Sequence, residues 1–187
     1  IISCFKKVHA DINSFVKVRQ ESNVVLKALT EGLLAAGFEV ETGKKAAEKI
    51  TIPVLFGLNG KVLKSFDVDA ASLDRKVVLE VEAGRAVVNH QFLKDLFESC
   101  VMPGVEHLVI AVRNTYNGAD DFEKVCDFIS TLYASSRFRI PLNSITIIGR
   151  KLKTLPTPAK IPSIINDLMA AIHKLSFFII FLSIILI

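Results

Sequence analysis

The sequence predicts an α/β domain in which a mixed central sheet is flanked by helices. Three observations support this class. A helix-spaced apolar pattern covers about residues 20–36, alternating segments of strand length follow it, and two continuous apolar runs come later, each after a helical segment. This order is typical of an antiparallel meander joined to a crossover unit. We therefore expect a domain over residues 1–150, with a C-terminal appendage.

Each element has its own local signal. Val25, Leu29 and Leu33 define the apolar face of the first helix, which Gly37 is expected to end. The pair Asn59-Gly60 predicts the turn of a hairpin. In chain order, strands are expected at 38–42, 52–57, 62–69 and 76–82, a helix with core residues Phe92 and Phe97 at 83–101, a strand at 107–112, a helix at 119–135 and a strand at 144–149.

Composition excludes several classes of protein. Of 187 residues, 51% are hydrophobic and 22% charged, which excludes intrinsic disorder. The net charge of +4 permits an anionic partner without requiring one. The 3 cysteines form no CxxC pair, so we expect no disulfide framework or zinc site, and a reducing, cytoplasmic location. Neither a P-loop nor a G-x-S-x-G motif occurs.

The two chain ends carry separate signals. The first residue is Ile1 and no leader pattern follows it, so we expect a partial reading frame, not a secreted precursor. Residues 151–162 are predicted to be a basic, proline-containing linker, and residues 163–187 a helix with an apolar tail. The uncharged tail over 175–187 is shorter than the roughly 20 residues of a membrane-spanning helix. A truncated membrane span, a helix buried in an oligomer and a fragment end all stay open.

Four acidic residues are the most informative feature. Asp67 and Asp69 share one face of a predicted strand, as do Glu80 and Glu82 on the next. A hairpin turning near 71–75 would set the two pairs side by side, where like charges about 4 Å apart repel by about 4 kcal/mol at an effective dielectric constant of about 20. Such carboxylates are either solvated on an outer face, or protonated or neutralised by a cation such as Mg²⁺.

The runs Ser65-Phe-Asp-Val-Asp-Ala and Val78-Leu-Glu-Val-Glu-Ala-Gly-Arg resemble the catalytic hairpin of the PD-(D/E)XK nuclease superfamily. The nearest form is the Glu-x-Glu variant of some type II restriction endonucleases. The resemblance covers about residues 20–150 and implies a restriction-endonuclease-like α-β-β-β-α-β core. Glu82 stands where the family usually has Lys, and Val68 stands in place of the motif's Pro.

The resemblance implies a Mg²⁺-dependent endonuclease of DNA, with Mn²⁺ as a substitute ion and a homodimer as an expected assembly. Asp69 and Glu80 would hold the metal, with Asp67 competing for the first role, and Glu82 would orient or deprotonate the attacking water. Further candidates are an acidic ligand, Glu31, and phosphate contacts at Arg85, Asn89, Arg137 and Arg139.

The last two arginines open a stretch between Phe128 and Asn166 that has 6 basic and no acidic residues. Such a stretch could follow a nucleic-acid backbone, because phosphate contacts do not depend on sequence. Two other functions stay open. The first is a non-catalytic nucleic-acid-binding or assembly module on the same scaffold, and the second is a membrane-tethered interaction protein.

Overall fold

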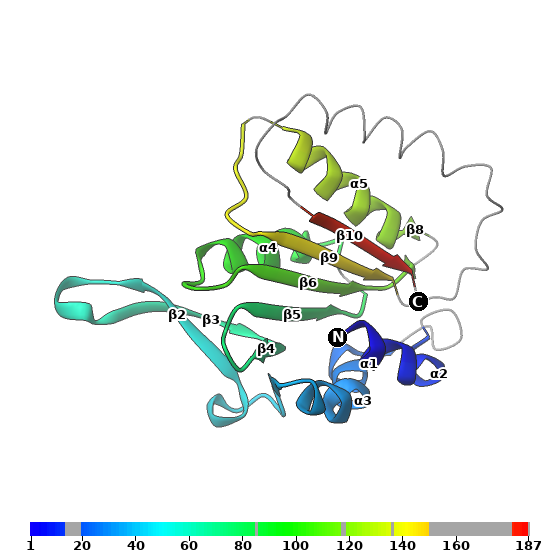
Figure 1. Ribbon diagram of the computed structural model, residues 1–187, viewed down its shortest axis with the longest axis horizontal. Helices are drawn as coiled ribbons and strands as arrows, with labels where there is room; N and C mark the ends of the chain where they lie inside the picture. The colour runs from blue at the N-terminus through cyan, green and yellow to red at the C-terminus, as the bar shows by residue number, and fades with distance from the viewer. Residues whose placement is uncertain (14–19, 85, 117–118, 136, 150–180, 187) are drawn as a thin grey trace.

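A mixed sheet forms the centre of the molecule (Figure 1). The computed structural model describes residues 1–13, 20–84, 86–116, 119–135, 137–149 and 181–186. Strands β5, β6, β9 and β10 run parallel, whereas β4 runs antiparallel to both β1 and β5. The strand order is β1 (Phe38–Val40), β4 (Ala70–Ser72), β5 (Val77–Glu82), β6 (His107–Val112), β9 (Ser144–Gly149) and β10 (Phe181–Leu186). The α/β class with a mixed sheet is thus confirmed.

Helices cover both faces of the sheet. One face packs against α1 (Ile2–Lys7), α2 (His9–Ile12) and α3 (Ser22–Ala35), and the other against α4 (Gln91–Val101) and α5 (Asp121–Ala134). Alternation along β5 sends Leu79 and Val81 to the first face and Val78 to the second. Glu80 and Glu82 share the parity of Val78, so their side chains lie on the face that α4 covers.

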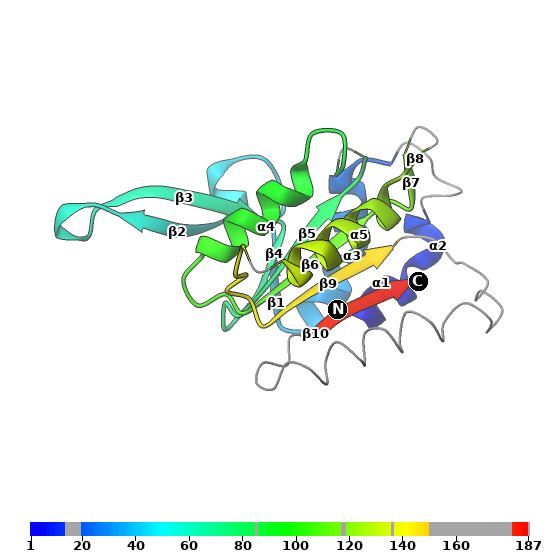
Figure 2. The ribbon, with the colours of Figure 1, turned by 90° about the horizontal axis from the view of Figure 1, so that it is seen from above.

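A two-stranded arm projects from the body of the molecule. Strands β2 (Ile50–Phe56) and β3 (Val62–Val68) pair antiparallel, and Figures 1 and 2 both show their far end extending beyond the rest of the chain. The single-turn η2 (Leu58–Gly60) joins them, with Asn59 at φ 60° and Gly60 at φ 74°. Those left-handed values are what Asn and Gly accept most readily, so the predicted turn is confirmed.

The remaining described elements are short. The 3₁₀ turn η1 (Ala46–Glu48) precedes the arm, and β7 (Thr115–Tyr116) pairs antiparallel with β8 (Ala119–Asp120) ahead of α5. The Asp120 carboxylate caps α5 by accepting a hydrogen bond from the Glu123 backbone N–H at 3.2 Å. Acidic residues at this helix start match the prediction for 119–135, because a helix N-terminus favours negative charge.

The pairings predicted for strand 62–69 are confirmed in part. β3 pairs with β2 across the predicted Asn59-Gly60 turn, whereas the antiparallel partner of β5 is the short β4 and not β3 itself. Asp69 is the residue at which the chain leaves the arm and enters the sheet. Period-two alternation is identical for either pairing, so the sequence pattern alone could not separate them.

The helix predicted over 83–101 begins only at Gln91. His90, directly before it, has φ 51°, a left-handed conformation that cannot continue a right-handed helix. The shift also changes which side chains face the core: Phe92 is 3% exposed, but Phe97 is 59% exposed, so its predicted core position is wrong.

The apolar tail contributes a strand. Residues Phe181–Leu186 form β10, which pairs parallel with β9 from Ser144 to Gly149. A helix is therefore excluded for that part of the tail. The predicted linker over 151–162 and the predicted helix from about residue 163 to 175 lie outside the described residues. No helix among the described segments is long and apolar enough to cross a membrane.

Candidate active site

Asp69 lies across from Glu80 in the central sheet. The register of β4 with β5 pairs Ala70 with Leu79, and continuing it by one residue sets Asp69 opposite Glu80. The backbone N–H of Val81 donates a hydrogen bond of 2.7 Å to Oδ2 of Asp69. The Asp69 backbone carbonyl accepts a second bond, of 2.8 Å, from the N–H of Glu41. These bonds hold the first predicted metal ligand beside the second.

Burial dominates the electrostatics of this pair. It raises the pKa of Asp69 to about 6, with further upward effects from the charges of Glu41 and Glu82 and a downward effect from the Val81 N–H. Burial and the neighbouring charge of Asp69 also raise the pKa of Glu80 well above its usual range. The fold therefore places two carboxylates where their ionisation is unfavourable unless a cation joins them.

Asp95 brings a further carboxyl group to the site from α4. It is 4% exposed, and burial, the charge of Glu82 and a hydrogen bond with Glu82 raise its pKa to about 8. A hydrogen bond between two carboxyl groups needs one proton, and the raised pKa assigns that proton to Asp95. Glu82 is thereby held as the acceptor, beside the Asp69–Glu80 pair.

Lys94 is the basic residue whose charge acts on this cluster of carboxyl groups. Its Nζ lies 3.2 Å from Oε2 of Glu98, one turn along α4. Partial burial lowers the pKa of Lys94, but the bond with Glu98 and the charges of Asp95 and Glu80 outweigh it and raise the pKa overall. Its charge in turn lowers the pKa of both Asp69 and Glu80. Lys94 thus supplies, from a helix, positive charge that the Glu-x-Glu motif lacks on its strand.

Asp67 lies apart from these acids, on the arm. Lys49 Nζ is 2.7 Å from Asp67 Oδ2, and the Thr51 hydroxyl donates a 2.7 Å hydrogen bond to Oδ1. The hydrogen bonds from Lys49 and Thr51 lower the pKa of Asp67. Both carboxylate oxygens are already engaged, so the geometry favours Asp69 over Asp67 as the ligand beside Glu80.

The other predicted site residues are dispersed. Glu31 is exposed on α3, which covers the opposite face of the sheet from Glu80. Asn89 is exposed in the turn before α4, and Arg85 lies outside the described residues. Arg137 and Arg139 are exposed in the segment between α5 and β9, at the edge where the parallel strands begin. None of the described members of this set contacts the carboxylates in the structure.

The sequence did not predict Asp95 and Lys94 as site residues. The run Lys94-Asp95-Leu96 sits inside an amphipathic segment, where charged residues usually mark a solvated face. One signal was present: with the helix beginning at Gln91, Asp95 falls one turn after it and close to the apolar stripe of Phe92 and Leu96. Only the packing of α4 on β5 shows that this stripe carries the acid into the interior.

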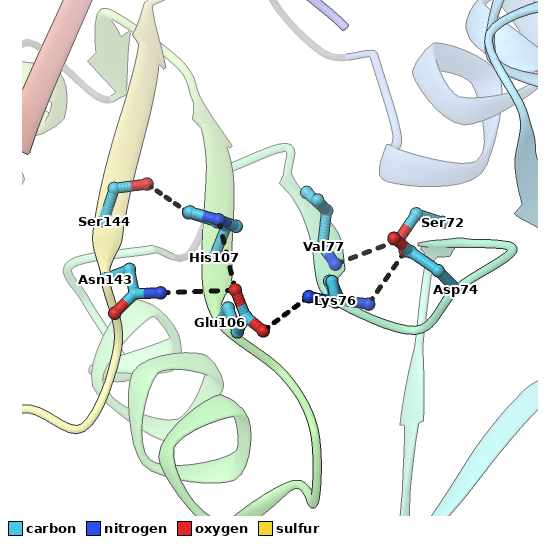
Figure 3. Close-up of polar contacts among 8 residues, drawn as sticks. All are labelled: Ser72, Asp74, Lys76, Val77, Glu106, His107, Asn143 and Ser144. Carbon is cyan, nitrogen blue, oxygen red and sulfur yellow. Dashed lines mark hydrogen bonds and ion pairs between the residues drawn. The ribbon is translucent and has the colours of Figure 1, made fainter.

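A second polar cluster lies at the end of the sheet where the parallel strands β5, β6 and β9 begin (Figure 3). Lys76 Nζ lies 2.9 Å from Glu106, and Asn143 donates a 3.2 Å hydrogen bond to the same carboxylate. His107 Nδ1 lies 2.8 Å from the Ser144 hydroxyl. Lys76, more than any other group, lowers the pKa of Glu106. These side chains pair with one another across neighbouring strands, so they stabilise this end of the sheet.

The described residues include no group of three His, Cys, Asp or Glu side chains placed to enclose a metal ion. Two carboxylates remain a fitting donor set for Mg²⁺, which commonly takes one or two from protein and completes its shell with water and substrate phosphate. No family model matches the sequence, and the comparisons with curated proteins and with solved structures found no match either.

Proposed function

We propose that the protein is a Mg²⁺-dependent nuclease that hydrolyses DNA phosphodiester bonds, of the restriction type. The observation that carries the proposal is the placement of Asp69 opposite Glu80, both half-buried and both with a raised pKa. Strongly perturbed carboxyl groups that share one site are typical of catalytic positions. The sequence resemblance to the PD-(D/E)XK superfamily supports the same residues.

Each residue has a distinct role in the proposed reaction. Asp69 and Glu80 would hold Mg²⁺, or Mn²⁺ in its place, through carboxylate oxygens. When bound, the ion would polarise the scissile phosphate and acidify a bound water. Glu82, held by the protonated Asp95, accepts the proton of the attacking water. Lys94 offsets the negative charge that builds up on the phosphate oxygens.

The test is cleavage of plasmid and oligonucleotide DNA with and without Mg²⁺, comparing the wild type with Glu80→Ala. Glu106→Ala, at the opposite edge of the sheet, is the matched control. We expect metal-dependent cutting by the wild type and the control, and a loss of about 100- to 1,000-fold in Glu80→Ala, the range typical for removal of one key electrostatic group.

Two outcomes contradict the proposal. Equal cutting by Glu80→Ala would place the chemistry elsewhere. Intact DNA in every reaction, together with salt-sensitive binding, would instead favour the non-catalytic nucleic-acid-binding module. Titration of Mg²⁺ into the wild type and Glu80→Ala by calorimetry separates loss of the ion from loss of the chemistry.

A further inference from the structure

The far half of the arm exposes large apolar side chains that nothing in the described structure covers. Leu58, at the turn, is 91% exposed. Four more residues around it are between 45% and 64% exposed: Leu55, Phe56, Val62 and Leu63. Single exposed apolar residues are ordinary on protein surfaces, but a contiguous group of this kind marks a contact surface.

Only the base of the arm packs against the body. There, Ile52 and its partner Phe66 lie in the core on the α4 side of the sheet. Beyond that base, the register pairs Leu55 with Lys64 and Phe56 with Val62. Val62 and Leu63 are neighbours on one strand and point to opposite faces, so the exposed apolar side chains lie on both faces of the far half of the arm.

The arm is also basic. Residues 52–66 include Lys61 and Lys64 and no acidic residue. Lys64 Nζ lies 5.0 Å from the centre of the Phe66 ring, on the side of the ribbon that leads to the core. The partner of this surface must therefore accept positive charge as well as apolar side chains.

We propose that the arm grips duplex DNA, with Lys61 and Lys64 on phosphates and Leu58 entering a groove as an apolar wedge. The inference rests on the proposed function for the position of the duplex at Asp69 and Glu80. Two-stranded ribbons bind in either groove of DNA, and Leu is among the apolar side chains that minor-groove proteins insert between base steps.

DNA fits the arm better than a second copy of the chain does. In a symmetric contact between two arms, the lysines of both copies would lie close together and repel. Pairing through the strand edges is hindered as well, because β2 carries Pro53 and register irregularities between Pro53 and Phe56. Phosphate groups satisfy the charge, and stacked bases accept the apolar tip.

The experiment measures binding of a fluorescently labelled duplex by anisotropy, in chelator and at several salt concentrations, so that cleavage cannot interfere. The variants are Lys61→Gln/Lys64→Gln and Leu58→Asn. The controls are Lys6→Gln/Lys27→Gln, which removes two exposed lysines from α1 and α3, and Leu73→Asn, which alters an apolar side chain that is 68% exposed elsewhere.

We expect the double lysine variant to lower the slope of log affinity against log salt by roughly 1.8, since each phosphate contact contributes about 0.9. We expect Leu58→Asn to weaken binding at least ten-fold without changing that slope. It should also abolish the fluorescence rise of a 2-aminopurine base in the duplex, a signal of unstacking. Both controls should bind as the wild type does.

Several results would overturn the proposal. These are wild-type protein that binds no duplex, an unchanged salt slope in the double lysine variant, or arm variants that keep duplex affinity while dissociating a dimer in sedimentation. The last would assign the arm to a second copy of the chain. Failure of the nuclease proposal is distinguishable, because arm-dependent binding without Mg²⁺-dependent cutting would leave the arm's role intact.

Discussion

The two ends of β5 carry polar clusters of opposite character. At its beginning, Lys76 and the neighbouring Glu106 are ion-paired and largely solvated, and the pKa of Glu106 is lowered. Farther along the same strand, Glu80 is half-buried among other acids and its pKa is raised. Both clusters join adjacent strands. Without a bound ligand, only the cluster of Lys76 and Glu106 stabilises the strands that it joins.

The contrast separates acids whose charge stabilises the fold from acids whose charge the fold disfavours. A lowered pKa means that the folded protein favours the charged form, so the carboxylate strengthens the native state. A raised pKa means that the native state tolerates the charge at a cost. Proteins keep such groups chiefly where function requires them.

The largest effect that would sharpen this comparison is on cleavage by Lys94→Met. If Lys94 offsets charge on the phosphate, its loss should lower the rate by about 100- to 1,000-fold, equivalent to about 2.7–4 kcal/mol. Lys76→Met, which removes a lysine from the opposite cluster, should cleave at the wild-type rate. Single-turnover cleavage with saturating Mg²⁺ measures both variants, and equal losses would erase the distinction between the two ends.

The second effect is on stability against pH. The folded pKa of Asp69, about 6, exceeds its ordinary value of 3.8, so the native state binds more protons than the unfolded state between those values. The free energy of unfolding should therefore fall as pH rises through this window, by about 3 kcal/mol from Asp69 alone. Asp95, at about 8, extends the fall toward pH 8.

Urea denaturation at pH 4.5, 6 and 8 tests this dependence, with Asp69→Asn expected to flatten its lower part. Saturating Mg²⁺ should restore stability at pH 8, because a ligand of the native state shifts the equilibrium toward it. A stability that rises steadily with pH in the absence of metal would contradict the raised pKa values.

The smallest effect concerns the turn between β4 and β5, next to the polar cluster of Lys76 and Glu106. The Ser72 hydroxyl accepts a 2.9 Å hydrogen bond from Val77 N–H and donates one of 2.6 Å to Asp74. Ser72→Ala should lower the free energy of unfolding by about 1 kcal/mol and Tm by about 2–4 °C. Its rate of DNA cleavage should stay at the wild-type level. A drop in cleavage would show that the two ends of β5 are coupled.

Much of the fold could be predicted because its signals are local. The alternation in β5, the apolar run of β6 and the Asn59-Gly60 turn each depend on neighbours in sequence, and all three were predicted correctly. The opposition of Asp69 and Glu80 was also predicted, although strand 62–69 itself was expected to produce it. It arises from β4, a strand too short to have an alternation of its own.

The remaining features depend on contacts between distant residues. Asp67 separates from Asp69 because β3 ends at Val68 and the chain continues in the central sheet as β4. Asp95 enters the site because α4 starts at Gln91 and lies on β5. Neither arrangement has a signal in the sequence close to Asp67 or Asp95.

Asp69 lies at the junction between the arm and the central sheet. It is the one residue between β3 and β4, so the chain changes strand partners there without slack. A swing of the arm about its base must be absorbed in the backbone dihedral angles around this residue, which also orients the carboxylate. In the proposed enzyme, binding of a duplex by the arm would therefore set the orientation of the Asp69 carboxylate. A duplex bound in the wrong position would leave this metal ligand misaligned.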